Sequence, residues 1–515
     1  MATTIDISAA ATARKSRARK PTKTTLDSFP SPEAEEVTPI ELQDITAHYS
    51  KIYGSEVVED RAIPDFRDGL KPVHRAALWA MYVNKIHHNT QHKKAARTVG
   101  DIIGKYHPHG DTAAFGAMVT ITNYVMPNLI DGKGNWGNHV NNAAHYRYVE
   151  ARLSEFTDKF LLDKDYLAVV PMVENFDGTE TWPLFLPALL PVQLLVGSPP
   201  APAYGISAGT PSFKIKGVAK LVSLALAGKE ITPQMCLKYL ELNQRFGGIC
   251  TSSDAEYLEL YSTGKGSLRF VPDIVASEDQ KLISVMSCCP GGFQTEKSIN
   301  SSLEKIAGFP AVARVTDSSG RGGGKYGIKY NIALKRVSDD VYDDTFDKIE
   351  KAVSGSMSYH IGYTHRKRTE TTFGRMNIPK FIHTWVKYRI SLELAVLRYL
   401  ITVEQKKLER QRLLLWGTDH IDDIALALKD RTLGPKKRLM KLWPDKSEEF
   451  VGEILKLQVQ QLARLERSKV LEKIKEIQQQ ITALTADQKQ PAVRVLRTFD
   501  STVAAYCNKT SDRLE

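Results

Sequence analysis

The chain has 515 residues, of which 42% are hydrophobic and 25% charged, so it is too long for one hydrophobic core and we expect two to four domains. Its 70 lysines and arginines exceed its 59 acidic residues, and the resulting net charge of +11 permits a polyanionic partner without requiring one. The five cysteines form no C-x-x-C pair and fit neither a zinc site nor a disulfide framework, which favours a reducing compartment. Apolar runs are too short for a membrane span and the N-terminus lacks the apolar core of a secretory signal, so we expect no membrane partner and a cytoplasmic protein.

Residues 1–36 are rich in Ala, Ser, Thr, Lys and Pro and predict a disordered, basic N-terminal arm. The stretch "RKSRARKPTK", residues 14–23, holds six basic residues and no acidic one. Such a stretch is typical of an arm that grips nucleic-acid phosphates, and equally of a solvated tail or a targeting signal.

Residues 37–165 combine helical periodicity with glycine-rich turns, and residues 166–375 favour an α+β domain. The second range holds short β-branched runs such as "LISVMSC" and "KYNIALKRV", separated by turn residues. "DSSGRGGGKYG", residues 317–327, predicts a hairpin loop.

Residues 376–515 change to long helices with apolar residues at steps of three and four. One stripe comprises Ile390, Leu394, Leu397 and Ile401, and a later one comprises Val470, Ile474, Ile477, Ile481 and Leu484. A glycine- and proline-containing segment separates the two helices. The pattern favours an antiparallel coiled coil with a small helical knob at its end, and a compact helical bundle is the alternative.

Four motifs lie between residues 61 and 152. The first, "RAIPDFRDGLKPVHRAALWAMY", begins at Arg61 and predicts a helix after Pro72. Lys71, His74 and Arg75 then cluster near the start of that helix, where free backbone N–H groups also attract anions. We favour a phosphate site over a solvated charged face.

The second motif is "GKYHPHGDTAAFGAMV", in which His107 and His109 precede Asp111 and Thr112. We expect Asp111 to cap a helix and the two imidazoles to face an anion. A metal site is the alternative, but the proline between the histidines opposes convergence on one ion and no further His or Cys cluster completes a ligand set. We therefore expect no metal on this chain.

The third motif, "DGKGNWGN", is a tight turn in which Asn135 could help to cradle a phosphate. The fourth is "AAHYRYVEARL", which contains Tyr146, Arg147 and Tyr148. A phenol has a pKa of about 10 and is a poor nucleophile at neutral pH unless cations stabilise the charge that develops. Arg147 is adjacent in sequence, and folding would have to bring Arg61, His107 and His109 to the phenol.

The order of these motifs, followed by "NFDGTETWPLFLP", resembles the DNA breakage-reunion subunit of type IIA DNA topoisomerases, the family of gyrase A and topoisomerase IV A. The resemblance covers about residues 40–510 and is strongest over residues 61–187. It implies an α+β multidomain fold: a winged-helix DNA-cleavage domain over 37–165, an α/β tower or shoulder domain over 166–375, and an antiparallel coiled coil over 376–515 whose terminal knob forms a dimerisation gate.

The resemblance also implies a role for each matched residue. Tyr148 takes the position of the nucleophile that attacks a DNA phosphodiester and joins the 5′ end of a transient double-strand break. Arg147, Arg61 and His109 match the catalytic cations. Trp182 takes the place of an aliphatic wedge that bends DNA, although a tryptophan could instead pack inside the domain. The remaining DNA-binding positions that we expect are Lys71, His74, Arg75, His107, Asp111, Thr112 and Asn135.

Cofactors and partners follow from the same resemblance. The chain has neither a P-loop nor the acidic cluster that binds Mg²⁺ in this family, so we expect Mg²⁺ and ATP on a B-type partner subunit in a heterotetramer. Two strands require two tyrosines, so we expect a homodimer on double-stranded DNA in the bacterial cytoplasm or nucleoid. The chain has no room for a C-terminal wrapping domain, which favours relaxation or decatenation over supercoiling and suggests a bacteriophage version expressed in an infected cell.

Two other functions remain open at this point. A metal-dependent nuclease would use His107, His109 and Asp111 and would leave permanent breaks. A non-catalytic DNA-binding scaffold would form no covalent adduct with DNA.

Overall fold

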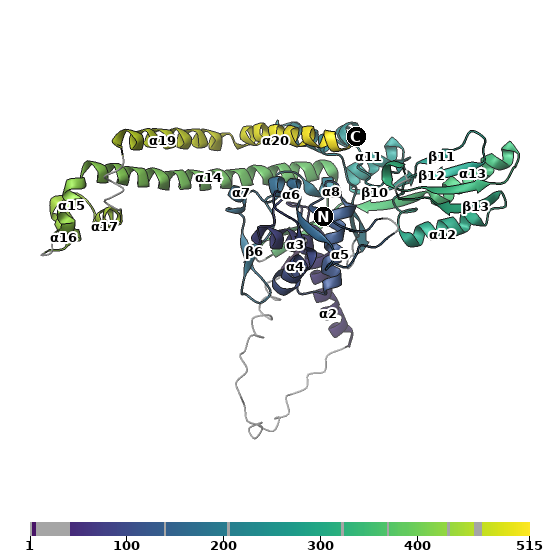
Figure 1. Cartoon of the computed structure of the whole chain (residues 1–515), viewed down its shortest axis with the longest axis horizontal. Coiled ribbons are helices and arrows are strands. Elements are labelled where there is room, and N and C mark those ends of the chain that lie inside the picture. Colours follow the sequence, from purple (N-terminus) through teal and green to yellow (C-terminus); the bar gives the residue numbers. More distant parts are fainter. Residues whose placement is uncertain are drawn as a thin grey trace, which may run out of the picture. The chain divides into compact units, whose positions relative to one another are not determined.

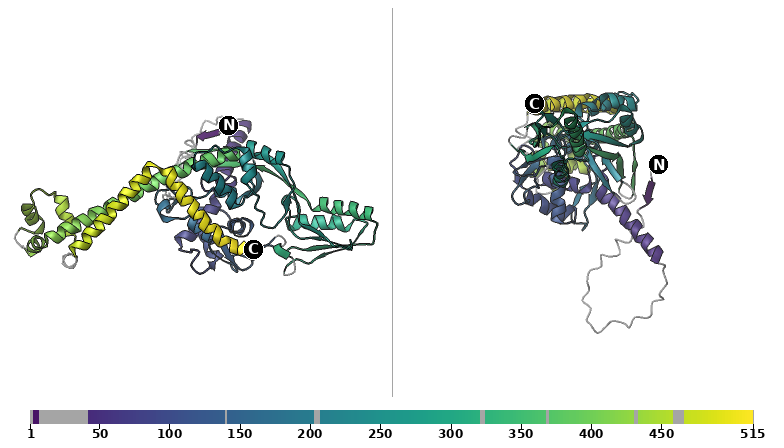
Figure 2. Two further views of the ribbon diagram at one scale, coloured as in Figure 1. Left: turned by 90° about the horizontal axis from the view of Figure 1, so that it is seen from above. Right: turned by 90° about the vertical axis from the view of Figure 1, so that its right-hand side faces the viewer.

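Two compact units make up the chain in the computed structural model (Figures 1 and 2). The first comprises residues 1–388 and 499–515, and the second comprises residues 389–498. The structure describes residues 3–6, 42–138, 141–202, 207–320, 324–367, 370–429, 433–457 and 466–514. Helices and several antiparallel sheets are both present, as expected for an α+β protein.

The N-terminal part of the first unit is a helical lobe with one small sheet. Its helices are α2 (Leu42–Val57), η2 (Val58–Ala62), α3 (Pro72–Val83), α4 (Ala95–Asp101), η3 (Ile102–Tyr106), α5 (Asp111–Val119), η4 (Thr120–Tyr124), α6 (Glu155–Phe160) and α7 (Lys164–Leu167). Its sheet has the order β2-β4-β3, with β2 at Lys93–Lys94, β3 at Ile130–Lys133 and β4 at Glu150–Leu153. All pairs in this sheet are antiparallel, and β4 is the central strand.

The rest of the first unit holds the other sheets. A five-stranded sheet has the order β7 (Ser198–Pro202), β8 (Ser207–Thr210), β15 (Gly355–His360), β10 (Lys265–Val271) and β9 (Ile249–Cys250). A four-stranded sheet has the order β11 (Ile274–Ala276), β12 (Leu282–Val285), β14 (Tyr330–Leu334) and β13 (Val312–Asp317). The accompanying helices are α8 (Val192–Val196), α9 (Ile215–Leu226), α10 (Pro233–Tyr239), α11 (Asp254–Thr263), α12 (Glu296–Ala307), η5 (Gly324–Tyr326) and α13 (Asp339–Val353).

Strand pairing agrees with the predicted hairpin around residues 317–327. Strands β13 and β14 are antiparallel on either side of it, and Gly320 N–H donates to Gly327 O at 2.9 Å. A separate two-stranded hairpin joins β5 (Met172–Glu174) to β6 (Thr181–Pro183).

The prediction of disorder throughout residues 1–36 is wrong at its beginning. Strand β1 (Thr3–Asp6) pairs antiparallel with β17 (Glu370–Arg375), which also pairs with β16 (Gly362–Arg366). The edge of β17 offers unpaired backbone groups, and a short β-branched segment can satisfy them regardless of its overall polarity. The basic stretch over residues 14–23 lies outside the described residues.

Buried charges organise the segment that precedes α3. Asp65 Oδ2 accepts from Arg67 Nη2 at 2.6 Å, and Arg67 Nη2 also donates to Arg366 O at 2.6 Å. Burial by itself would raise the pKa of Asp65, but the Arg67 guanidinium outweighs burial and holds that pKa below its usual value. The guanidinium also stacks on the Phe185 ring, with Cζ 3.7 Å from the ring centre.

Arg75 belongs to the same buried network, which corrects its predicted role in DNA binding. Its side chain is 1% exposed, and Nε and Nη2 donate to the two carboxylate oxygens of Asp68 at 2.7 and 3.1 Å. Asp68 also accepts from Leu186 N at 2.9 Å. The position of Arg75 near the start of a helix suggested a cation at the surface. In the structure Arg75 is buried, as are the residues that follow it, Ala76, Ala77 and Leu78.

The second unit consists of helices. It contains most of α14 (Ile378–Asp419), the first turns of α20 (Pro491–Leu514), and all of α15 (Ile421–Lys429), α16 (Pro435–Leu442), α17 (Glu448–Leu455) and α19 (Arg467–Lys489). Helix α19 runs beside α14 in both Figures 1 and 2. The two helices are antiparallel, because Arg467 at the start of α19 donates to Asp419 at the end of α14 at 2.8 Å.

Burial in this unit agrees in part with the apolar stripes. In α19, the five predicted positions are the least exposed between residues 467 and 485. In α14, the more deeply buried residues are Leu392, Val396 and Leu397, whereas Ile390 and Leu394 are half-buried. Glu393 is buried on the same face, and its Oε1 accepts a hydrogen bond from Arg494 Nε at 2.7 Å. Helices α15–α17 pack around a small core that includes Leu439, Trp443 and Val451.

Contacts divide the chain differently from the predicted ranges. The boundary lies after Tyr388, inside α14, and residues from Phe499 onward belong to the first unit. A continuous helix can pass from one packed unit to another without a linker, so composition gives no sign of the division. No helix in the described part of the chain is long and apolar enough to cross a membrane.

We expect Arg75→Met to lower the free energy of unfolding of the first unit by about 3–5 kcal/mol, because it leaves the buried Asp68 carboxylate without its counter-charge. Urea titration followed by tryptophan fluorescence measures the change. Lys348→Met is the control, since its ion pair with Asp344 is exposed and its loss should change stability by less than about 1 kcal/mol. Equal losses in the two variants would contradict the structural role of Arg75.

Candidate active site

Tyr148 lies at the surface immediately before the central strand of the small sheet. Its side chain is 68% exposed, whereas Val149 is 1% exposed and packs inward. Residues 146–148 form a turn in which Tyr148 N donates to His145 O at 2.9 Å. Strand β4 begins at Glu150 and is paired on both edges, so the phenol stands on a fixed backbone.

Arg147 is oriented by a residue that sequence reasoning passed over. Its backbone N and its Nε lie 3.4 and 3.2 Å from His145 Nδ1, which accepts from them. This arrangement requires the His145 tautomer that carries its proton on Nε2. Arg147 Cζ lies 5.9 Å from the centre of the Tyr148 ring, so the guanidinium and the phenol share one exposed surface.

Tyr146 is held in a different environment from Tyr148. Its hydroxyl donates to Asp111 Oδ2 at 2.8 Å, and its ring packs edge-on against Phe115 at 5.8 Å between centroids. The hydrogen bond to Asp111 raises the pKa of Tyr146 and lowers the pKa of Asp111. A phenol fixed as a donor to a carboxylate is a poor nucleophile, so the two tyrosines of this loop are not equivalent.

Asp111 is the first residue of α5 rather than its cap. Gly110 takes the cap position, and Asp111 Oδ1 accepts from Thr112 N at 2.8 Å. The prediction placed the cap one residue too late, because a carboxylate before an apolar run is the usual capping signal. Since Oδ2 accepts from Tyr146, the same carboxylate connects the helix start to the tyrosine loop.

The two histidines of the second motif stack on each other. Their ring centroids are 4.0 Å apart with an interplanar angle of 12°. Stacked rings point their nitrogens outward in parallel planes instead of toward one ion, and the Asp111 carboxylate is already engaged. No group of three or more His, Cys, Asp or Glu side chains in the described part of the chain is placed to hold a metal. The stacked histidines therefore give no support to the nuclease alternative, which needs both imidazoles on one ion.

The remaining predicted residues come from the segments before α3 and α5 and from the first turns of these helices. Arg61 is exposed at the end of η2, and His109 is exposed just before α5. Among the described residues, no hydrogen bond, ion pair or ring contact joins either one to Tyr148. Thr112 is exposed, and Lys71 and His74 are half-buried at the start of α3.

Asn135 serves its own turn. Its Oδ1 accepts from Gly137 N at 3.0 Å, and its backbone O accepts from Ala144 N at 3.0 Å. The turn is built over the buried Trp136, whose Nε1 donates to Glu150 O at 3.2 Å. The side chain of Asn135 is exposed, so a phosphate contact stays a prediction.

Trp182 does not present its ring at the surface, which corrects its predicted place as a DNA wedge. It lies on β6, is 9% exposed, and packs against Tyr106 with 5.8 Å between ring centroids. The hydroxyl of Tyr106 donates to Glu180 at 3.2 Å and holds that ring in place. The indole of tryptophan has a much larger apolar surface than an aliphatic side chain. Packing that surface against the Tyr106 ring is more favourable than leaving it exposed to solvent.

Two positive residues flank the base of the tyrosine loop, and neither was among the residues predicted for the site. Lys94 and Lys133 lie on the strands on either side of β4, and their Nζ atoms are 3.3 and 3.7 Å from the Glu150 carboxylate. This interaction lowers the pKa of Glu150. Only strand pairing brings residues from three separate strands into this row, so sequence spacing could not reveal it.

We expect Tyr146→Phe to increase hydrogen exchange at the backbone amides of residues 144–148 by about fivefold, because it removes a hydrogen bond worth roughly 1 kcal/mol. Hydrogen-exchange mass spectrometry measures the rate. Tyr49→Phe changes an exposed phenol elsewhere and should leave this segment unaffected. Unchanged exchange in Tyr146→Phe would show that the Asp111 contact does not hold the loop.

We expect Trp182→Ala to reduce stability by about 3–5 kcal/mol, because it leaves a cavity beside Tyr106, without changing the bend of bound duplex DNA. Energy transfer between labels at the two DNA ends measures the bend at a temperature where both proteins are folded. A folded Trp182→Ala protein that bends DNA less than the wild type would restore the wedge.

Comparison with known proteins identifies the family. The family model that describes the A-type subunit of DNA gyrase and topoisomerase IV matches residues 61–498. Similar proteins include the A-type subunit of DNA gyrase from Synechocystis, 30% identical over 453 residues that cover 83% of this chain and 50% of that relative. Its counterpart from Leptospira biflexa is 35% identical over 301 residues, covering 56% of this chain and 35% of the relative. The counterpart from Spiroplasma citri is 40% identical over 193 residues, covering 37% and 84% respectively.

In the first two matches the chain spans half or less of the relative's length. The family model nevertheless extends over most of the chain, including α3, α5 and the loop that carries Tyr148. This chain therefore belongs to the family formed by the A-type subunits of DNA gyrase and topoisomerase IV.

Proposed function

We propose that this chain is the DNA cleavage and religation subunit of an ATP-dependent type II DNA topoisomerase, and that Tyr148 is its nucleophile. The observation that carries the proposal is the contrast between the two tyrosines of one loop. Tyr148 is exposed beside the Arg147 guanidinium, whereas Tyr146 is fixed as a donor to Asp111. Family membership supports the same reaction.

In the proposed step, the Tyr148 oxygen attacks a backbone phosphorus and the phenol gives up its proton. The bond from phosphorus to the 3′ oxygen breaks, and that oxygen leaves as a 3′ hydroxyl once it has taken a proton. The product is a 5′-phosphotyrosine ester, and attack by the 3′ hydroxyl reverses the step. One bond forms as one breaks, so cleavage itself consumes no nucleotide.

Arg147 would stabilise the additional negative charge that appears on the phosphate oxygens as the phenol attacks. Its guanidinium is already oriented by His145, so little conformational freedom is lost when DNA binds. Arg61 and His109 are proposed as further catalytic cations. Lys71, His74, His107, Thr112 and Asn135 are proposed to contact DNA, and Asp111 to act by holding Tyr146.

Mg²⁺ is proposed to come from a B-type subunit that also carries the ATPase. The described part of this chain offers no set of carboxylates for the ion, and Asp111 is occupied by Tyr146 and Thr112. Mg²⁺ supplies charge stabilisation at the phosphate when it is bound.

The architecture is proposed to follow the family. Helices α3–α5 with the sheet β2-β4-β3 would form a winged-helix domain, the larger sheets a tower, and α14 with α19 a coiled coil that ends in the α15–α17 core. Two copies would place two tyrosines on the two DNA strands and would join B-type subunits in a heterotetramer. A DNA substrate of this kind places the enzyme in the cytoplasm or nucleoid.

We expect Tyr148→Phe to abolish covalent attachment to DNA, a loss of at least about 1,000-fold, because phenylalanine has no nucleophilic oxygen. The full chain is incubated with DNA, Mg²⁺ and a B-type subunit, then denatured with detergent, and protein bound to 5′ ends is quantified. Tyr146→Phe is the matched control and should retain the adduct within about tenfold.

Each outcome separates the candidate functions. An adduct that persists in Tyr148→Phe would assign the nucleophile elsewhere. Breaks with free ends in both variants would indicate a nuclease, and the absence of any adduct in the wild type would indicate a DNA-binding scaffold.

A further inference from the structure

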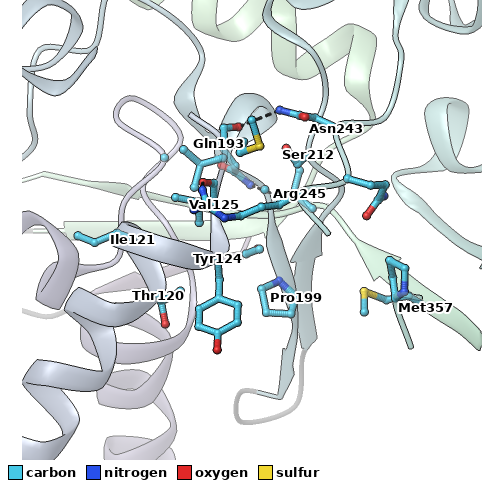
Figure 3. A pocket seen from close by; sticks show the side chains of 18 of the residues that line it. Thr120, Ile121, Tyr124, Val125, Gln193, Pro199, Ser212, Asn243, Arg245 and Met357 are labelled. Carbon is cyan, nitrogen blue, oxygen red and sulfur yellow. Dashed lines mark hydrogen bonds between the residues drawn. The ribbon is translucent and has the colours of Figure 1, made fainter. Parts of the chain in front are cut away.

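A cavity of about 400 Å³ lies in the first unit between the helical lobe and the sheets (Figure 3). Its walls come from the segment before α3, from η4 and the loop after it, from the end of α8, from residues 243–247 and from β15. Residues 198–199, 210–212 and 288–294 also contribute, so segments far apart in the sequence converge on one space, part of which is open to solvent. Two of its lining residues, Lys71 and His74, belong to the first sequence motif, whereas Arg245 lies in none of the motifs.

The lining of the cavity is positively charged. Lys71 and Arg245 contribute the charge, and no aspartate or glutamate occurs among the described residues that line the cavity. A concave wall that carries one sign of charge concentrates the field and attracts the opposite ion.

Arg245 carries a charge that its protein contacts do not neutralise. Its Nη1 donates to Val125 O at 3.1 Å and its Nη2 donates to Asn123 Oδ1 at 3.0 Å, and both acceptors are uncharged. Figure 3 shows the side chain extended across the cavity wall toward Val125. Burial lowers the pKa of Arg245, which reports the cost of keeping this cation partly away from water.

Lys71, which lies immediately before α3, is a second cation in the cavity lining. Burial lowers its pKa, and no ion pair to it occurs among the residues that the structure describes. A half-buried cation without a counter-ion is destabilising, and a bound anion would relieve that penalty for both side chains together.

His74 adds a hydrogen-bonding group instead of a third charge. Burial, assisted by the charges of Lys71 and Arg75, lowers the pKa of His74 to about 3, so its imidazole is neutral near pH 7. Two fixed cations and a neutral imidazole match a tetrahedral oxyanion, which offers several acceptor oxygens to one guanidinium and one ammonium.

We propose that this cavity is a binding site for a phosphate group, held by Lys71 and Arg245. The phosphate could belong to the backbone of bound duplex DNA, in which case the inference rests on the proposed function. It could instead belong to a small phosphorylated molecule, which would not require DNA cleavage at all.

The first test uses inorganic phosphate and the full chain. We expect phosphate to raise the melting temperature saturably, by about 2 °C or more relative to chloride at equal ionic strength. Arg245→Gln should lose this rise, while Arg245→Lys, which keeps the charge, should retain part of it. Arg336→Gln removes an exposed charge outside the cavity and should respond like the wild type.

The second test distinguishes the two sources of phosphate. Affinity for duplex DNA is measured by fluorescence anisotropy over a range of salt concentrations. If a backbone phosphate occupies the cavity, the slope of log K against log[salt] should become shallower by about one in Arg245→Gln and stay unchanged in Arg336→Gln. An unchanged slope together with a lost phosphate response assigns the cavity to a small molecule.

The proposal is overturned if Arg245→Gln matches the wild type in both measurements. Lys71→Gln removes the second charge and leaves both Arg245 hydrogen bonds in place, so it repeats the test if Arg245→Gln fails to fold. Neither measurement depends on the Tyr148 adduct, so a failure of the proposed reaction and a failure of this site give different results.

Discussion

The first unit depends on a segment that passes through its interior carrying four charges. Asp65 pairs with Arg67 and Asp68 pairs with Arg75, and all four side chains are buried. Backbone contacts fix the same segment to β16, because Phe66 N donates to Thr364 O at 3.0 Å and Thr364 N donates to Pro64 O at 2.9 Å. A buried carboxylate without its arginine would destabilise the fold. The elements that this segment joins therefore stay packed only while both ion pairs are intact.

A close backbone approach completes this arrangement. Gly69 has a φ of +67°, and a Cβ there would lie 2.3 Å from Gln193 N. Helix α3 starts three residues later at Pro72, so the network sets the position of Lys71 and His74 on one side and of Arg75 on the other. The basic residues that looked equivalent in sequence therefore divide into two that line the cavity and one that belongs to the core.

The tyrosine loop shows a similar division at a smaller scale. Its motif is a feature of local sequence, and the structure places β4 directly after Val149. The contact that distinguishes its tyrosines is not local, because Asp111 is 35 residues from Tyr146. The ion pair at the base of the loop is not local either, because Lys94 is 56 residues from Glu150. Since such contacts arise from packing α5 and β2 against the loop, periodicity and spacing could indicate reactive residue types but not which phenol remains exposed.

Sequence by itself determined the mixed α+β class, helix α3 after Pro72, the hairpin around residues 317–327 and the apolar stripe of α19, because propensity, turn residues and periodicity act over a few neighbouring positions. Tertiary structure decided the burial of Arg75 and Trp182, the strand at residues 3–6 and the boundary inside α14. It also decided the cavity around Arg245. Burial and charge compensation depend on which distant segments meet, and that information is spread over the whole chain instead of residing in any motif.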